Sequence, residues 1–435
     1  MSDERIRRRW IAIVLCLAAI ALFYIENHGA YRGYFSEDDL VNITWPTFVG
    51  NDVFEKGLVS PAFDASNFRP VGFLYYRYAG RGFGLNYPPY VALLQLFHIL
   101  NAVLLWFLLR TFGFSPLGAW AGAIFYGLNA VVMEAYWKPM YVFDVLCATF
   151  CLTALILYLR GRWIWAFLAF WLAYKSKELA VMLPLVLLAC EWWLGEKRWK
   201  RLIPFFAASA CFGVGALFHN RAVLPSSDYN LSFAPASLWH ALLFYSGALL
   251  LFPAAALVLL ALPFFIRDRR LYIGLILAGV MLAPLLALSH RLRAVYWYVP
   301  LIGLAIVMAA IASRMKPWVL AALALAWLPL NYAVLREKRR DVLAAANENR
   351  WFLHDLQAYK RMAPPLRAVV YDNPPGHIRA AAEAAIHLVF GPDVDAAWID
   401  EPRAEEVMKE VPVAVVTYVP PTHQLQVRLR TTPIE

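Results

Sequence analysis

Charged residues are scarce in this chain: Asp, Glu, Lys and Arg together make up 16% of its 435 residues, whereas hydrophobic residues make up 61%. Since a soluble domain is about half apolar and about a quarter charged, this composition excludes a large soluble enzyme. Aromatic residues are abundant, with 17 Trp and 22 Tyr, many of them beside Arg or Lys at the ends of apolar runs. Such positions are typical of the aromatic belts at bilayer interfaces. The composition therefore predicts a polytopic membrane protein.

Motifs that bind nucleotides or metal ions are absent. The sequence has no Walker loop, HExxH motif, paired Cys motif or nucleotide-binding glycine fingerprint, which argues against ATP-driven transport and zinc hydrolysis. The net charge of +10 comes from short clusters between apolar runs, so no nucleic-acid partner is expected. The cysteines lie in apolar runs without metal or redox spacing and are predicted to be small core residues: Cys16, Cys147, Cys151, Cys190 and Cys211.

Long apolar stretches predict about 11 transmembrane helices, because each crossing of the hydrocarbon takes roughly 20 residues. No internal repeat with a period of about 20 to 50 residues accompanies them. The expected fold class is an all-α polytopic membrane protein. The stretches fall near residues 10–24, 89–109, 114–133, 142–159, 163–174, 179–194, 202–218, 238–266, 271–289, 295–312 and 317–335.

The distribution of Arg and Lys predicts how the chain crosses the membrane. If the amino end is cytoplasmic, most Arg and Lys residues of the short loops lie on the cytoplasmic side. The first span is then predicted to be a signal anchor. Residues 25–88 then form a long first outer loop. The cluster Arg336, Lys338, Arg339 and Arg340 falls outside, against the rule, and we expect the rule to yield to the preceding loops.

After residue 338 the sequence changes character. Short apolar strands alternate with helical stretches, which predicts a small extracytoplasmic α/β domain over 339–435, attached to a transmembrane domain over 1–338. The expected strands are 366–371, 394–398, 413–419 and 424–429, and the expected helices are 377–390 and 401–410.

The acidic segment, Ser36-Glu37-Asp38-Asp39, is the first candidate for chemistry. One interpretation is a solvated turn in which Ser36 or Asp38 caps a helix that begins at Leu40. The other is a general base whose proton affinity is raised by the neighbouring negative charges. The sequence leaves both open.

Further charged residues fall at the same predicted face. The cations could pair with lipid headgroups or extend their side chains to the membrane interface. Alternatively, they could bind a lipid phosphate. Arg293 is best placed for this, because it lies beside aromatic residues at the start of a helix. Carboxylates at membrane level are costly unless they are paired or functional, and Glu178 could pair with Lys175 or Lys177. The candidate cations are Arg69, Lys138, Lys175, Lys177, Arg291 and Arg293, and the further carboxylates are Glu134, Asp144 and Glu178.

Several motifs in consistent order between residues 30 and 310 carry a resemblance to a known family. They are Glu37-Asp38-Asp39, Phe68-Arg69-Pro70-Val71, Phe97-His98-Ile99-Leu100-Asn101, Asn129 to Ala135, Phe143 to Leu146, Lys175 to Glu178, and Arg293 to Gly303. This order resembles the glycosyltransferase C superfamily, and within it the transmembrane O-mannosyltransferases that carry tetratricopeptide repeats and their bacterial relatives. Two features differ: Asn129-Ala130 stands where that family has His-Pro, and the tail has no such repeats.

The resemblance implies transfer of a sugar, with inversion, from a polyprenyl-phosphate donor to an acceptor hydroxyl on a protein, lipid or glycan. Asp38 or Asp39 would be the base, and cations such as Arg293 and Lys177 would stabilise the leaving phosphate. Glu37, Glu134, Asp144 and Glu178 would line the cavity. No obligatory metal is expected, although Asp38, Asp39 and Glu134 could share a divalent ion. The implied location is a bacterial inner membrane, with the site facing the periplasm.

Two other functions remain open. A transporter of lipid-linked sugars or polysaccharides would use the same charges to guide a headgroup, but the sequence shows no matching halves. A membrane scaffold that has lost its activity is compatible with Asn129-Ala130, but the carboxylates of the acidic segment are intact.

Overall fold

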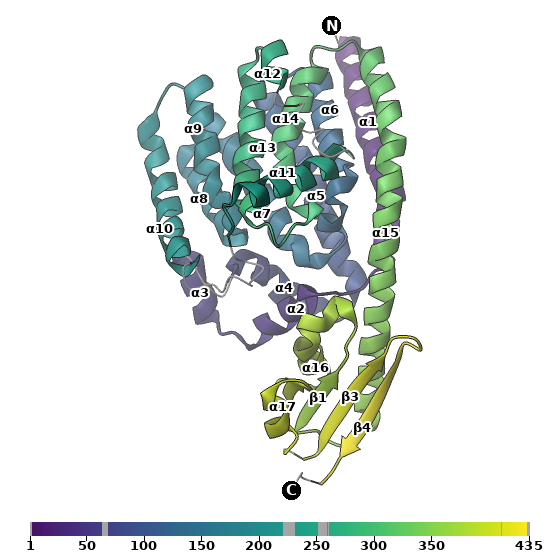
Figure 1. Ribbon diagram of the computed structural model, residues 1–435. Helices are drawn as coiled ribbons and strands as arrows, with labels where there is room; N and C mark the ends of the chain where they lie inside the picture. Colours follow the sequence, from purple (N-terminus) through teal and green to yellow (C-terminus); the bar gives the residue numbers. More distant parts are fainter. Residues whose placement is uncertain are drawn as a thin grey trace.

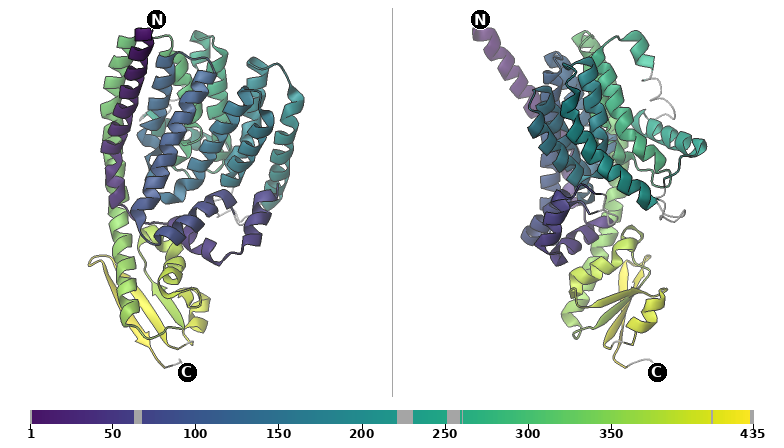
Figure 2. Two further views of the ribbon diagram at one scale, coloured as in Figure 1. Left: turned by 180° about the vertical axis from the view of Figure 1, so that it is seen from behind. Right: turned by 90° about the vertical axis from the view of Figure 1, so that its left-hand side faces the viewer.

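The computed structural model describes residues 2–62, 68–220, 231–250, 259, 261–409 and 411–432. It consists of a helical bundle, a set of short helices at one end of it, and a small α/β unit beyond them (Figure 1). The amino terminus lies at the opposite end of the bundle (Figures 1 and 2). The predicted apolar stretch 238–266 falls partly outside the described residues, at 251–258 and 260.

Most helices of the bundle run roughly along one common direction, whereas α11 lies across them (Figure 1). Many of them begin with a proline in the first turn, where its fixed φ suits the helix and its missing N–H is not needed. The helices are α1 (Ser2–Asn27), α5 (Tyr87–Thr111), α6 (Pro116–Gly127), α7 (Val142–Leu159), α8 (Trp163–Ser176), α9 (Leu183–Trp193), α10 (Ile203–Asn220), α11 (Pro235–Leu250), α12 (Leu262–Phe265), α13 (Arg269–Ala287), α14 (Leu301–Ala312) and α15 (Pro317–Met362).

Within the described residues, 4 helical segments are long and apolar enough to cross a membrane. They are Tyr87–Thr111, Pro139–Leu159, Arg269–Ala287 and Pro317–Met362, and α6 with η2 (Ala130–Tyr136) makes a fifth if the bent pair is one span. These apolar helices support an integral, multi-pass membrane protein. Several other bundle helices are shorter than the roughly 20 residues of a full crossing, so the expected number of about 11 spans stays a prediction.

Close packing between α6 and α14 depends on small residues. A Cβ atom on Gly118 would lie 2.7 Å from the carbonyl oxygen of Ala309, and one on Gly122 would lie 2.6 Å from that of Ala305. Both distances are too short for a real contact. Glycines four residues apart let helix backbones approach where no hydrophobic driving force exists between them.

The predicted outer loop, residues 25–88, contains short helices. They are η1 (His28–Arg32), α2 (Asp38–Phe48), α3 (Asn51–Val59) and α4 (Pro70–Phe83). These helices lie between the bundle and the α/β unit, at the end of the bundle opposite the amino terminus (Figure 1). Helix α2 packs against α4 and also against α16 of the α/β unit.

Helix α15 runs the length of the bundle, packs against η1 and η2, and continues beyond the bundle into the α/β unit (Figures 1 and 2). Its 46 residues would extend about 69 Å at 1.5 Å per residue. The expected domain boundary, between 338 and 339, falls inside this helix. Two of the four cations that oppose the positive-inside rule are engaged by protein there: Lys338 donates to the carbonyl of Val131 (3.1 Å), and Arg339 lies over the Trp137 ring (5.8 Å).

The C-terminal unit (residues 368–430) is a four-stranded sheet in the order β2-β1-β3-β4. Strands β1 and β2 and strands β1 and β3 are parallel, and β4 is antiparallel to β3. Helices α15 and α16 pack on one face, whereas α17 packs on Ala368 and Val370 of the other. The predicted strands and helices are confirmed: β1 (Ala368–Asp372), η8 (Gly376–Ala381), α16 (Ala382–Phe390), β2 (Asp395–Trp398), α17 (Pro402–Val407), β3 (Val413–Val419) and β4 (Gln424–Arg430).

The chain breaks sharply between α6 and η2, which are bent by 64°. Asn129, which replaces the family's His, caps η2 by accepting the N–H of Val131 (3.0 Å). Asn331 of α15 closes the break from outside: its amide donates to the carbonyl of Leu128 (2.7 Å) and accepts the N–H of Ala130 (2.8 Å). One buried amide therefore satisfies both backbone groups freed by the bend.

Replacing Asn331 with Leu should destabilise the protein, because the carbonyl of Leu128 and the N–H of Ala130 would lose their partner in an apolar region. We expect a loss of about 2 kcal/mol or more in the free energy of unfolding. Thermal unfolding in detergent or lipid nanodiscs measures it. Leu330→Ala is the matched control, because Leu330 is exposed on the same helix. Equal melting temperatures for the two variants would contradict the role of Asn331.

Candidate active site

The acidic segment forms the turn that enters α2. The helix begins at Asp38, not at Leu40, and neither Ser36 nor Asp38 makes a side-chain cap, so the predicted cap is wrong. Instead, Asp39 Oδ2 accepts the N–H of Ser36 (3.1 Å). Within this turn, Glu37 has φ 45° and ψ −123°, a conformation that residues other than glycine rarely adopt. The turn is therefore shaped by Asp39 and carries strain at Glu37.

The two aspartates lie in different environments. Asp39 is fully buried, and its Oδ1 accepts the hydroxyl of Tyr76 (3.1 Å). Burial raises the pKa of Asp39 to about 7, and its hydrogen bonds with Ser36 and Tyr76 oppose the shift only in part. The charge of Asp38, which the sequence suggested as a cause, contributes least to this pKa. The side chain of Asp38 is 55% exposed, so only this carboxylate of the pair is open to a substrate.

Three of the predicted cations face the acidic segment. Arg293 Nη1 lies 3.1 Å from Glu37 Oε2 and donates to the hydroxyl of Tyr141 (3.4 Å). Lys138 Nζ lies 3.9 Å from Glu37 Oε1 and 3.3 Å from Glu134 Oε2. Because the Lys138 side chain is only 13% exposed, it does not snorkel to a headgroup. Glu37 therefore bridges cations from two different parts of the bundle.

Arg291 and Tyr296 connect Asp38 to a second pair. Arg291 Nη2 lies 3.8 Å from Asp38 Oδ2, and its Nε donates to the hydroxyl of Tyr296 (2.9 Å). The other side of Tyr296 is covered by Lys177, whose Nζ lies 4.8 Å from the ring centre. Lys177 pairs with the nearly buried Asp144. Tyr296 thus contacts both cations, Arg291 through its hydroxyl and Lys177 through its ring.

Arg69 pairs with Glu178 at 2.7 Å. The sequence had left open a pairing of Glu178 with Lys175 or Lys177, and Arg69 is its partner among the ion pairs of the described residues. The Arg69 guanidinium lies 5.4 Å from the ring centre of Phe143, the residue before Asp144. This ring packs so closely on α4 that a Cβ on Gly72 would come within 2.1 Å of it, which makes glycine necessary there.

Lys175 lies apart from these pairs in its described contacts. Its amine donates to the carbonyl of Ser60 and lies 4.4 Å from the ring centre of Tyr174. The side chain of Lys175 is mostly buried, so its aromatic and carbonyl contacts stabilise its charge. The structure thus assembles the other candidate cations with carboxylates and directs Lys175 towards the end of α3.

The charged cluster is defined by five cations, Lys138, Arg69, Lys177, Arg291 and Arg293, and five carboxylates, Glu37, Asp38, Glu134, Asp144 and Glu178. Every member has a partner of opposite charge, which offsets the cost of removing it from water. Among the described residues, no three His, Cys, Asp or Glu side chains are grouped to hold a metal ion. The cluster is therefore electrically balanced by side chains alone.

Tyrosine hydroxyls are the part of the site that the sequence motifs did not single out. Tyr76, Tyr141 and Tyr296 each hydrogen-bond a charged member of the acidic segment or the charged cluster. Of these three tyrosines, only Tyr296 could be linked to the site from the sequence, because it lies in the aromatic stretch after Arg293. The partners of Tyr76 and Tyr141 lie more than 30 residues away in sequence, so no local pattern reveals them.

The His-x-x-Asn motif of α5 supports the same aromatic stretch from inside the bundle. His98 Nδ1 lies 2.8 Å from the hydroxyl of Tyr298, and Asn101 donates to that hydroxyl at 3.1 Å. Thr149 of α7 donates to Asn101 Oδ1 (2.7 Å). The motif therefore anchors the segment that follows Arg293 and does not face the charged cluster with a free group.

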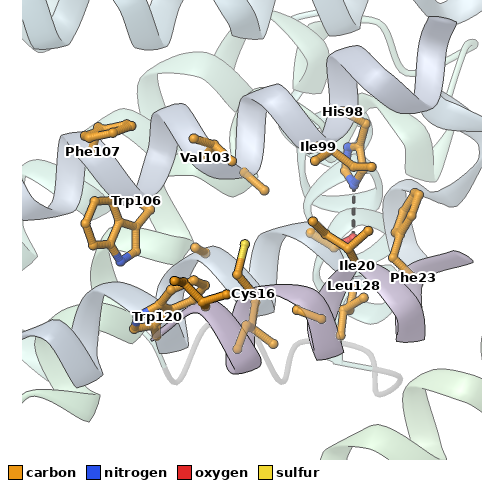
Figure 3. Close-up of a pocket in the computed structure, with 16 residues that line it drawn as sticks. Cys16, Ile20, Phe23, His98, Ile99, Val103, Trp106, Phe107, Trp120 and Leu128 are labelled. Carbon is orange, nitrogen blue, oxygen red and sulfur yellow. Dashed lines mark hydrogen bonds between the residues drawn. The ribbon is translucent and has the colours of Figure 1, made fainter. Parts of the chain in front are cut away.

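An apolar groove of about 360 Å³ runs between α1, α5 and α6 (Figure 3). Phe23, Leu128 and His98 lie at one end, and Trp106 and Trp120 lie at the other (Figure 3). Both ring nitrogens of His98 are engaged, Nδ1 by Tyr298 and Nε2 by the carbonyl of Gly127 (3.0 Å). The groove thus offers mainly hydrocarbon contacts, whereas the ionisable side chains gather in the pairs described above.

No protein-family model matches this sequence, and no curated protein sequence matches it. Its structure is similar to that of ArnT from Cupriavidus metallidurans, solved with bound undecaprenyl phosphate, with a TM-score of 0.54 at 14% sequence identity. The match covers 94% of this chain and 93% of that one. At this identity the likeness concerns the fold, and it extends over the bundle and the C-terminal unit together. The chain therefore shares the fold of ArnT, and this likeness supports the resemblance to the glycosyltransferase C superfamily that its motifs carry.

Proposed function

We propose that this protein is a membrane glycosyltransferase that moves a sugar from a polyprenyl-phosphate-linked donor to an acceptor hydroxyl. The observation that carries the proposal is the exposed carboxylate of Asp38 beside cations of the charged cluster. A base next to cations suits a reaction that removes a proton and releases a phosphate. The shared fold with a protein that binds undecaprenyl phosphate supports a lipid-linked donor.

Asp38 is the base in this proposal. The acceptor oxygen attacks the anomeric carbon, its proton passes to the Asp38 carboxylate, and the bond from that carbon to the phosphate oxygen breaks. A single displacement of this kind inverts the anomeric centre. The proposal assigns Asp39 no proton transfer, because Asp39 is fully buried and accepts hydrogen bonds from Ser36 and Tyr76 that hold the turn.

Cations of the charged cluster stabilise the leaving phosphate. Arg293 and Lys138 lie on either side of the Glu37 carboxylate, so a bound phosphate would replace Glu37 between them. Arg291 and Lys177 lie against opposite parts of Tyr296 and can reach the same charge. Arg and Lys together suffice for a phosphate leaving group, and the proposal therefore needs no obligatory metal.

The proposal also assigns the reaction to one side of the membrane. The site lies at the end of the bundle opposite the amino terminus (Figure 1), which for a cytoplasmic amino end is the outer face of a bacterial inner membrane. The donor's hydrocarbon chain can lie against apolar surfaces such as the groove along α1 and α5 (Figure 3). The acceptor is a hydroxyl of a protein, lipid or glycan.

Asp38→Asn should lower transfer by about 100-fold or more, the usual contribution of a general base. The measurement is release of free polyprenyl phosphate from defined polyprenyl-phosphate sugars by the purified protein in lipid, with acceptor extract supplied. Asp39→Asn is the matched control and should keep most of the activity, since Asn can still accept a hydrogen bond within the turn. If Asp39→Asn were inactive and Asp38→Asn were active, the role of base would pass from Asp38 to Asp39.

The same assay separates the enzyme from its rivals. Release that depends on the acceptor supports a transferase. Movement of intact lipid-linked sugar across the bilayer without release would favour a transporter. No release and no movement, from folded protein with all donors, would favour a scaffold.

Arg293→Gln should lower kcat/KM for the donor by about 10- to 100-fold, because one charge-assisted hydrogen bond to the phosphate is lost. Arg293→Lys should recover part of that loss, since the charge remains. Lys56→Gln is the control: Lys56 is an exposed cation of α3, paired only with Asp52 among the described ion pairs. Equal effects of Arg293→Gln and Lys56→Gln would contradict phosphate binding by Arg293.

The buried Asp39 should make stability depend on pH. Its pKa is about 7 in the folded protein and 3.8 in its ordinary state, so between these values the folded state keeps a proton that the unfolded state releases. The free energy of unfolding should therefore fall as pH rises through this window. Asn cannot titrate, so the melting temperature of Asp39→Asn should rise relative to wild type from about pH 5 to about pH 8. Asp38→Asn is the control, and the same trend in both variants would contradict this origin.

A further inference from the structure

We infer that the C-terminal unit and the adjoining half of α15 are positioning elements of the active site, which hold the acidic segment so that Asp38 faces Arg291. The inference rests on the proposed function for its catalytic meaning. It gives a role to a part of the chain whose sequence offered none. Three sets of contacts carry it.

The first contact is made by the C-terminal unit itself. The carbonyl of His377, in η8, accepts the N–H of Glu37 at 2.7 Å. Glu37 is the residue with the positive φ, and such a conformation persists only where the surroundings determine it. The bond from His377 therefore holds the strained residue directly before Asp38.

The second set comes from the part of α15 beyond the bundle. Asn349 is fully buried, and its amide donates to the carbonyl of Phe35 (3.1 Å). Arg350 donates to the carbonyls of Arg32 and Gly33, both at 2.8 Å. Neighbouring side chains of one helix thus hold the backbone that leads into the acidic segment.

The third contact lies on α2. The hydroxyl of Thr44 is 3.5 Å from the carbonyl of Ala384 in α16, and α16 packs along α2 (Figure 1). On its other side α2 packs against α4, with Leu40 and Ile43 buried. Helix α2 is therefore clamped between the outer helices of the membrane part and the C-terminal unit.

These contacts act on the backbone before and after Asp38, not on Asp38 itself. The Asp38 carboxylate is 3.8 Å from Arg291, and its place depends on the turn at Glu37. Loosening that turn should leave the cations of the charged cluster in place. The expected result is slower chemistry with unchanged donor binding.

The decisive variant is Asn349→Leu, which keeps a side chain of similar size in the buried position but leaves the Phe35 carbonyl without its donor. Asn347→Leu is the matched control, because Asn347 is exposed on the same helix two residues away. Hydrogen–deuterium exchange on the full chain in lipid should show the peptide over residues 33–39 exchanging about tenfold faster in Asn349→Leu. Asn347→Leu should exchange like wild type.

Kinetic measurements distinguish a loss of Asp38 positioning from a general loss of stability. Asn349→Leu should lower kcat about 10-fold while leaving the donor KM unchanged, as expected when an interaction important only to the chemical step is lost. In an Asp38→Asn background, Asn349→Leu should cause no further loss of the residual rate, because it acts through Asp38. Arg350→Gln should behave in the same way.

Unchanged exchange over 33–39 and unchanged kcat in Asn349→Leu would overturn the inference. A further loss of rate in the Asp38→Asn background would also overturn it, because it would show general damage. If the wild-type protein transfers no sugar, the proposed function fails, but the exchange experiment still decides whether α15 and the C-terminal unit hold the acidic segment.

Discussion

Charge at the end of an apolar bundle is stable only when it is paired, and this constraint governs the geometry of the site. The paired groups come from parts of the chain far apart in sequence: Glu37 meets Lys138 and Arg293, Asp144 meets Lys177, and Glu178 meets Arg69. Each pair therefore ties two elements together at the same time as it offsets desolvation. A site organised in this way is electrically balanced before any ligand arrives, and in the proposed reaction the donor phosphate takes the place of a carboxylate.

Deeper in the bundle, neutral polar side chains pair with other polar groups and so offset the cost of burying them. The amide of Asn331 satisfies both backbone groups at the break between α6 and η2. His98 and Asn101 meet the hydroxyl of Tyr298 and so fix the segment that follows Arg293. In hydrocarbon an unsatisfied polar group is costly, which explains why these amides and rings serve the architecture while the reactive groups lie at its end.

The long helix α15 joins the two halves of the molecule. Its first part packs against η2, and its last part carries Asn349 and Arg350 to the backbone before the acidic segment. Because the helix is continuous through 338 and 339, the C-terminal unit is mechanically connected to the bundle. Because of this continuity, the C-terminal unit can position the acidic segment relative to the bundle.

The sequence by itself determined the membrane class and the strands and helices of the C-terminal unit, because apolar periodicity and turn residues are local signals. The glycosyltransferase C likeness came from the order of its motifs, and the similar structure supports it. The sequence also identified the charged residues of the cluster. Only the tertiary structure decided which of them meet: that Glu178 pairs with Arg69, that Asp39 is buried while Asp38 is exposed, and that His377 holds Glu37. Neighbouring residues such as Asp38 and Asp39 have the same local chemistry, and their difference arises from what distant segments place around each of them.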